Sequence, residues 1–113
     1  MKLMLTSQDV IEESLAYRGT GGVSAENRAY GFLPAFLDRD TGRIHLCGAA
    51  AANAVTAHGF DGLPEECVLA RDAQGRPYAV KATLVVGFER QGYFFTREQA
   101  AQLIQWELDK LAS

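Results

Sequence analysis

The sequence predicts an α+β fold in which one antiparallel β-sheet of about four to five strands packs against an N-terminal and a C-terminal helix. Two observations carry this prediction: a helix-start signal lies near each end of the chain, and strand-like segments separated by turn residues fill the middle. The length of 113 residues suits a single domain spanning residues 1–113.

The first helix is predicted to begin after Thr6, because a hydroxyl group can cap the first turn and Asp9 places an acid there. The following side chains separate into two sides at helical spacing: Val10, Ile11, Ser14, Leu15 and Tyr17 against Asp9, Glu12 and Glu13. Gly19 is expected to end this helix in a left-handed conformation. Ser24 is expected to begin a short second helical turn.

The central segments are predicted to be strands. Residues 30–37 and 43–47 suit a hairpin around the turn sequence at 38–42. Pro34 cannot donate a backbone hydrogen bond, so it predicts an edge strand or a bulge. A short strand is expected over 67–71. Residues 49–57 are rich in alanine, and the sequence leaves their structure undecided.

Residues 78–88 form the clearest predicted strand. Apolar side chains occupy alternate positions, and polar side chains lie on the opposite face: Val80, Ala82, Leu84, Val86 and Phe88 against Lys81, Thr83 and Glu89. This alternation is typical of an antiparallel sheet with one buried face. Residues 93–95 are expected to pair back after a turn.

The last helix is predicted to follow Thr96, which forms a capping box with Gln99, and to run to about Leu111. Its apolar stripe consists of Ala101, Ile104, Leu108 and Leu111. In projection, Leu103 lies about 100° from the centre of this stripe and Trp106 about 160° from it, next to Lys110. Leu103, Trp106 and Lys110 are therefore the predicted partner-binding residues. The alternative is a tryptophan covered by a loop such as residues 49–57.

A glycine-rich loop is the second candidate site. Its backbone N–H groups and two arginines could bind an anion or a small ligand: Arg18, Gly19, Gly21, Gly22, Ser24 and Arg28. The spacing matches neither a phosphate-binding P-loop nor the dinucleotide-binding fingerprint. The alternative is a helix C-cap that continues into a tight connection.

Histidine and cysteine residues form the third candidate site. His45, Cys47, His58 and Cys67 could bind zinc as a tetrad or supply a thiol enzyme. No closely spaced ligand pair supports this hypothesis, and cysteines are often small buried apolar residues. We therefore predict no metal, no cofactor and no catalytic residue.

Composition argues against several classes of partner. The net charge of −3 lacks the basic excess of a nucleic-acid-binding protein. The sequence contains no apolar run long enough to span a membrane, and its start is too short for a signal peptide. Two cysteines without a secretion signal indicate reduced thiols, and hence a cytoplasmic protein.

Several sequence blocks resemble those of a group of small bacterial proteins of uncharacterised function. The blocks cover most of the chain and lie at residues 18–24, 31–38, 41–43, 61–64 and 87–98. This resemblance implies no activity. The leading hypothesis is a non-enzymatic protein-interaction module that self-associates, for example as a homodimer, or binds another protein, through the C-terminal helix or the exposed edge of the sheet.

Overall fold

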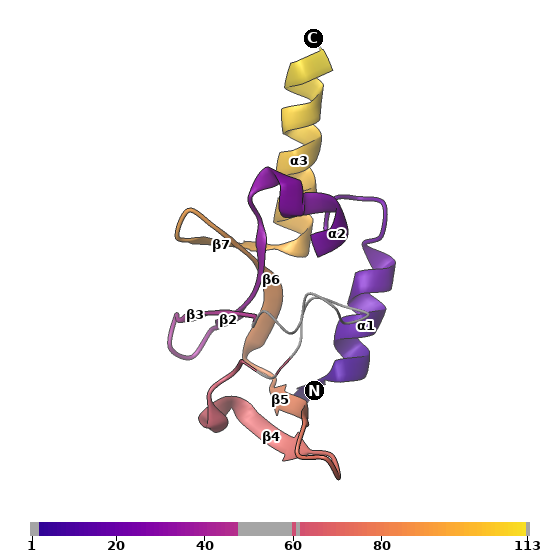
Figure 1. Ribbon diagram of the computed structural model, residues 1–113. Coiled ribbons are helices and arrows are strands. Elements are labelled where there is room, and N and C mark those ends of the chain that lie inside the picture. Colours follow the sequence, from indigo (N-terminus) through magenta and orange to yellow (C-terminus); the bar gives the residue numbers. More distant parts are fainter. Residues whose placement is uncertain (1–2, 48–59, 61, 113) are drawn as a thin grey trace.

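Two antiparallel β-sheets and three α-helices make up the fold in the computed structural model, which describes residues 3–47, 60 and 62–112 (Figure 1). The four-stranded sheet has the order β3-β2-β6-β7, formed by Ile44–Leu46, Leu33–Asp38, Leu84–Arg90 and Tyr93–Thr96. The three-stranded sheet has the order β1-β5-β4, formed by Met4–Thr6, Pro77–Lys81 and Val68–Arg71. The predicted α+β class is confirmed.

Both predicted long helices are present, with the predicted caps. In α1 (Ser7–Ala16) the hydroxyl of Thr6 accepts from the N–H of Asp9, and the Asp9 carboxylate accepts from the N–H of Thr6. In α3 (Arg97–Ala112) Thr96 and Gln99 exchange the same two bonds. Between them lie α2 (Ser24–Asn27) and two 3₁₀ turns, η1 (Arg28–Tyr30) and η3 (Glu65–Cys67). Local sequence thus fixes where both long helices begin.

Two apolar clusters form the core. The larger one joins α1 to both sheets and consists of Leu5, Val10, Phe36, Phe60, Leu63, Cys67, Val80, Leu84 and Val86. The smaller one joins α3 to the four-stranded sheet and consists of Phe32, Phe88, Ala100 and Ile104. Phe95 packs against this cluster, and the centroids of the Phe32 and Phe95 rings are 5.5 Å apart. Each of the two long helices is therefore held by its own apolar cluster.

The prediction of one sheet is wrong, because the predicted strand 78–88 is divided at residues 82–83. The N–H of Arg39 donates to the carbonyl of Thr83 over 3.0 Å, and the Thr83 hydroxyl donates to Asp38 over 3.1 Å. These bonds turn the chain between β5 and β6, so that the two strands enter different sheets. The predicted burial of Val80, Leu84 and Val86 is nevertheless confirmed.

The prediction that Pro34 marks an edge strand or a bulge is also wrong, since β2 lies between β3 and β6 in regular register. Pro34 instead limits the length over which β3 pairs with β2. The N–H of Cys47 donates to the carbonyl of Pro34 over 2.9 Å, but proline has no N–H to return the bond. The β2–β3 ladder ends at this position.

The predicted stripe on α3 is buried along only part of its length. Within the stripe, Ile104 is buried and Ala101 is half-buried, whereas Leu108 is 42% exposed and Leu111 is 82% exposed. The helix continues past the end of the sheets, as Figure 1 shows, so none of the described strands packs against its last turns. None of the helices in the described residues has the length and apolar character of a membrane span. Residues 49–57, whose structure the sequence left undecided, lie outside the described residues.

Candidate functional site

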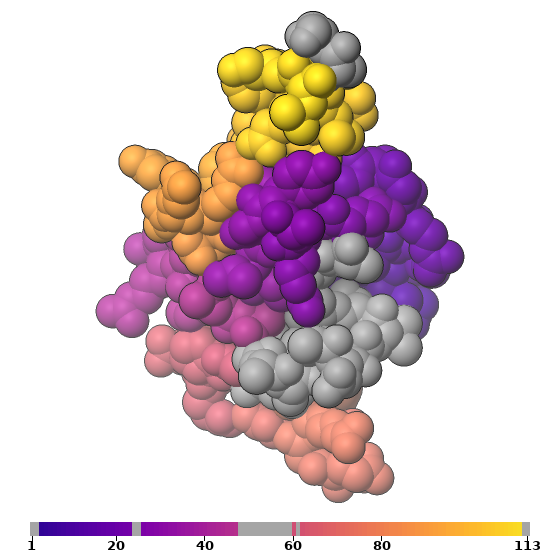
Figure 2. All heavy atoms as spheres, turned by 45° about the horizontal axis from the view of Figure 1, so that its top comes forward, coloured from indigo at the N-terminus to yellow at the C-terminus, as the bar shows by residue number. Residues whose placement is uncertain are grey.

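The end of α3 carries the predicted partner-binding residues. Figure 2 shows this end, in yellow, standing clear of the rest of the molecule. Trp106 is 55% exposed, and the ammonium group of Lys110 lies 4.6 Å from the centroid of its ring. Leu103 is half-buried and packs against the smaller core cluster. The cation–π contact with Lys110 covers part of the indole and restrains its position on the helix.

A shallow pocket lies one turn before Trp106 on the same side of α3. It has a volume of about 280 Å³ and is lined by Phe95, Gln99, Gln102 and Leu103. Its walls combine an aromatic ring and a leucine with two amide groups. Such a pocket can accept an apolar side chain that also carries a hydrogen-bond donor.

The glycine-rich loop already holds a carboxylate. The N–H of Gly19 donates to Oε2 of Glu26 over 2.6 Å, and the N–H of Gly21 donates to Oε1 over 2.9 Å. Gly19 and Gly21 have φ angles of 85° and 89°, which turn these N–H groups toward Glu26. An external anion would have to displace this carboxylate, so ligand binding at this loop stays a prediction.

Two buried side chains also hold this loop in place from the protein interior. The buried guanidinium of Arg97 donates to the carbonyl of Gly22 over 2.9 Å and to the hydroxyl of Ser14 over 2.7 Å. The buried Asn27 side chain donates to the carbonyl of Gly21 over 3.0 Å. Burial lowers the pKa of Arg97 from its usual value. These contacts support the structural alternative, a tight connection between α1 and α2, while Arg18 and Arg28 lie exposed at its margins.

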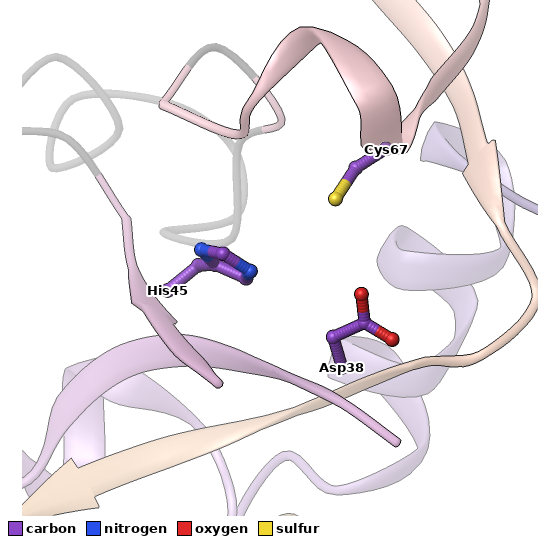
Figure 3. A group of neighbouring side chains, drawn as sticks. All are labelled: Asp38, His45 and Cys67. Atoms are coloured by element: carbon purple, nitrogen blue, oxygen red, sulfur yellow. The ribbon is translucent and has the colours of Figure 1, made fainter. Parts of the chain in front are cut away.

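The structure brings together two of the four predicted zinc ligands and adds a third residue. The ligand atoms of Asp38, His45 and Cys67 all lie within 4.8 Å of one another. Asp38 and Cys67 are buried and His45 is half-buried. Figure 3 shows the three side chains directed toward a common point from different segments.

Asp38 is the most strongly bonded member of this cluster. Lys81 donates to Oδ2 over 2.9 Å, while Thr83 and the N–H of Asp40 donate to Oδ1 over 3.1 Å and 3.0 Å. The hydrogen bond from Lys81 is the main reason why the pKa of Asp38 is lowered, and it raises the pKa of Lys81 in turn. Burial raises the pKa of Cys67. In the absence of a metal the cluster thus pairs an aspartate anion with a neutral thiol.

Cys47 is not part of this cluster. Cys47 packs against the larger core cluster, and burial raises its pKa to about 12. His58 lies outside the described residues. Comparison of the chain with protein families, with curated proteins and with solved structures gives no significant match.

Sequence reasoning missed Asp38 and Glu26. The turn sequence at 38–42 predicts a turn role for Asp38, although the hairpin register also places it beside His45. The N–H of Asp38 donates to the carbonyl of Arg43, so these residues are opposite each other and His45 shares their face. Glu26 gave no comparable signal, because its contact with Gly19 depends on how the loop folds.

Proposed function

We propose that this chain is a non-enzymatic protein-interaction module that self-associates through α3, each copy binding a second copy. The observation that carries the proposal is the position of Trp106, which is 55% exposed beside a pocket on the same side of the helix. Tryptophan is the residue type most enriched among the energetically dominant residues of interfaces.

A second copy fits this surface because the contact would be complementary to itself. In a two-fold symmetric dimer, a residue that meets a given position on its partner is met by that position in return. Antiparallel packing of two α3 helices on this side would place each Trp106 against the pocket of the other copy. Phe95 and Leu103 would enclose the ring, and the Gln102 amide could accept a hydrogen bond from the indole N–H.

The charge of this side of α3 supports the same arrangement. Gln99, Gln102, Leu103 and Trp106 are uncharged, and the two charged residues that follow on this side, Asp109 and Lys110, have opposite signs. Two copies of this side could therefore approach without strong repulsion between like charges. The contact is small, so we expect a dimer in the weak, transient class. We also propose that the module acts in the cytoplasm, since both cysteines are free thiols.

Sedimentation velocity over a concentration series tests the proposal. The wild-type mass should rise from monomer to dimer with concentration. Trp106→Ala should weaken the dimer by about 2 kcal/mol or more, which is about 30-fold in Kd, while circular dichroism stays unchanged.

Leu111→Ser is the matched control, because it also alters an exposed apolar side chain of α3 but on a different side of the helix. This variant should dimerise like the wild type. A wild type that stays monomeric at all concentrations contradicts the proposal. So does a dimer that Leu111→Ser dissociates and Trp106→Ala leaves intact.

A further inference from the structure

Three side chains with different metal-binding groups converge from three separate segments. Asp38 is the last residue of β2, His45 lies in the centre of β3, and Cys67 ends η3. The hairpin brings the first two onto one face, and η3 carries the third across to them (Figure 3). We propose that Asp38, His45 and Cys67 form a binding site for one divalent transition-metal ion, best matched by Zn²⁺.

The donor set determines which ion is favoured. Thiolate, imidazole and carboxylate are the three ligand types that protein zinc sites use. Ca²⁺ and Mg²⁺ prefer oxygen ligands alone, so Cys67 and His45 select against them. Three protein ligands would leave a fourth tetrahedral position for water or another small ligand.

The spacing requires only local adjustment. Bonds of about 2.0–2.3 Å in tetrahedral geometry separate ligand atoms by roughly 3.3–3.8 Å. The three ligand atoms lie within 4.8 Å of one another, so each pair must close by no more than about 1.5 Å. Rotation of the half-buried His45 side chain can close the two pairs that include it, and a change of the Cys67 χ1 angle can close the third.

The groups around Asp38 fix its orientation as the outer partners of metal ligands commonly do. Thr83 and the N–H of Asp40 together donate to Oδ1, whereas Lys81 donates to Oδ2. A carboxylate has about four lone-pair positions, so Oδ2 retains one for the ion. Lys81 would remain as the outer partner of the carboxylate.

Charge and protons balance without any redox step. The Cys67 S–H bond breaks, its proton goes to solvent, and the sulfur–metal bond forms. Asp38 binds as the carboxylate and His45 through a neutral ring nitrogen. The thiolate and the carboxylate carry two negative charges against the two positive charges of the ion, and the Asp40 carboxylate, 4.0 Å from the Lys81 ammonium, faces the remaining positive charge.

Metal binding by the purified full-length chain tests the site. After removal of metals with a chelator, Zn²⁺ is added and counted by native mass spectrometry, and Co²⁺ is added as a spectroscopic probe. We expect one ion per chain, a thiolate-to-Co²⁺ absorption band, and a higher Tm with Zn²⁺.

His45→Gln is the decisive variant, because His45 is half-buried whereas Cys67 belongs to the core. It should keep its circular dichroism spectrum, bind Zn²⁺ at least about 10-fold more weakly and lose the rise in Tm. Cys47→Ser and Asp72→Asn are matched controls, a second thiol and an exposed acid outside the cluster, and should bind like the wild type. No retained ion, binding unaffected by His45→Gln, or binding abolished by Cys47→Ser would overturn the proposal.

Discussion

The ion pair between Lys81 and Asp38 joins the two sheets, and its removal should have a large and pH-dependent effect. Lys81 ends β5 in one sheet and Asp38 ends β2 in the other. Nζ and Oδ2 are 2.9 Å apart, and the side chains are 26% and 3% exposed, respectively. Lys81→Met keeps the length of the side chain but leaves the Asp38 carboxylate buried without its cation.

The expected loss follows from this burial. Removing one partner of a buried ion pair costs about 3–5 kcal/mol. The lower end applies, because Lys81 is partly exposed and because Thr83 and Asp40 still donate to the carboxylate. We expect a loss of about 3 kcal/mol in the free energy of unfolding at pH 7, and a Tm lower by on the order of 10 °C. Urea unfolding followed by far-ultraviolet circular dichroism measures the first quantity.

The sign of the pH dependence identifies the cause. The pKa of Asp38 is lowered in the folded protein, chiefly by the hydrogen bond from Lys81. Such a carboxyl stabilises the fold above its unfolded pKa of about 3.9, and this contribution disappears as the pH falls through the lower folded value. The difference between wild type and Lys81→Met should therefore be largest near neutral pH and shrink below about pH 4.

The double variant Asp38→Asn/Lys81→Met provides the control, since it removes both charges. It should recover a substantial part of the stability that Lys81→Met loses. A loss below about 1 kcal/mol in Lys81→Met, or an equal loss at acidic and neutral pH, would refute the reasoning.

Three further predictions follow from single contacts. Glu26→Gln weakens the bonds to the N–H groups of Gly19 and Gly21, so both amides should exchange hydrogen faster at a cost of about 1 kcal/mol; unchanged exchange would argue against this contact. Gly87→Ala places a Cβ against the Phe94 ring and the Phe95 carbonyl, so urea unfolding should show a loss of about 2 kcal/mol or more, and a neutral effect would contradict the packing. Burial raises the pKa of both thiols, but only Cys67 is fully buried, so a thiol reagent at pH 7 should modify Cys67 no faster than the protein opens, and rapid modification of Cys67 in the folded protein would contradict its burial.

The features predicted correctly depend on short-range signals. The caps at Thr6 and Thr96 involve residues three positions away, and both are present as the sequence indicates. The division of strand 78–88 depends instead on Asp38, which Thr83 reaches across 45 positions of the chain. Alternation of apolar residues continues through the turn, so the pattern gives no sign of it. Asp38 and His45 lie in one hairpin, but Cys67 reaches them from η3, and motif spacing does not predict that long-range contact.

The C-terminal helix separates what periodicity predicts from what it does not. Periodicity identifies the side of α3 that packs on the sheet in part, since Ile104 of the predicted stripe is buried and Ala101 is half-buried. Periodicity does not show where the contact between α3 and the sheet ends. Leu108 and Leu111 lie on the same side of the helix but beyond that contact, and both are exposed. Isolated exposed leucines are common on monomers and by themselves indicate no partner.

Trp106 differs from these leucines because a pocket accompanies it. By helical geometry it lies about 140° around α3 from Leu111, so one partner helix cannot cover both side chains. Dimerisation through Trp106 would therefore leave Leu111 exposed, whereas dimerisation through the extended stripe would leave the indole exposed. Quenching of Trp106 fluorescence by iodide distinguishes the two arrangements: protection that increases with protein concentration supports the Trp106 interface, and constant quenching across the dimerisation range contradicts it.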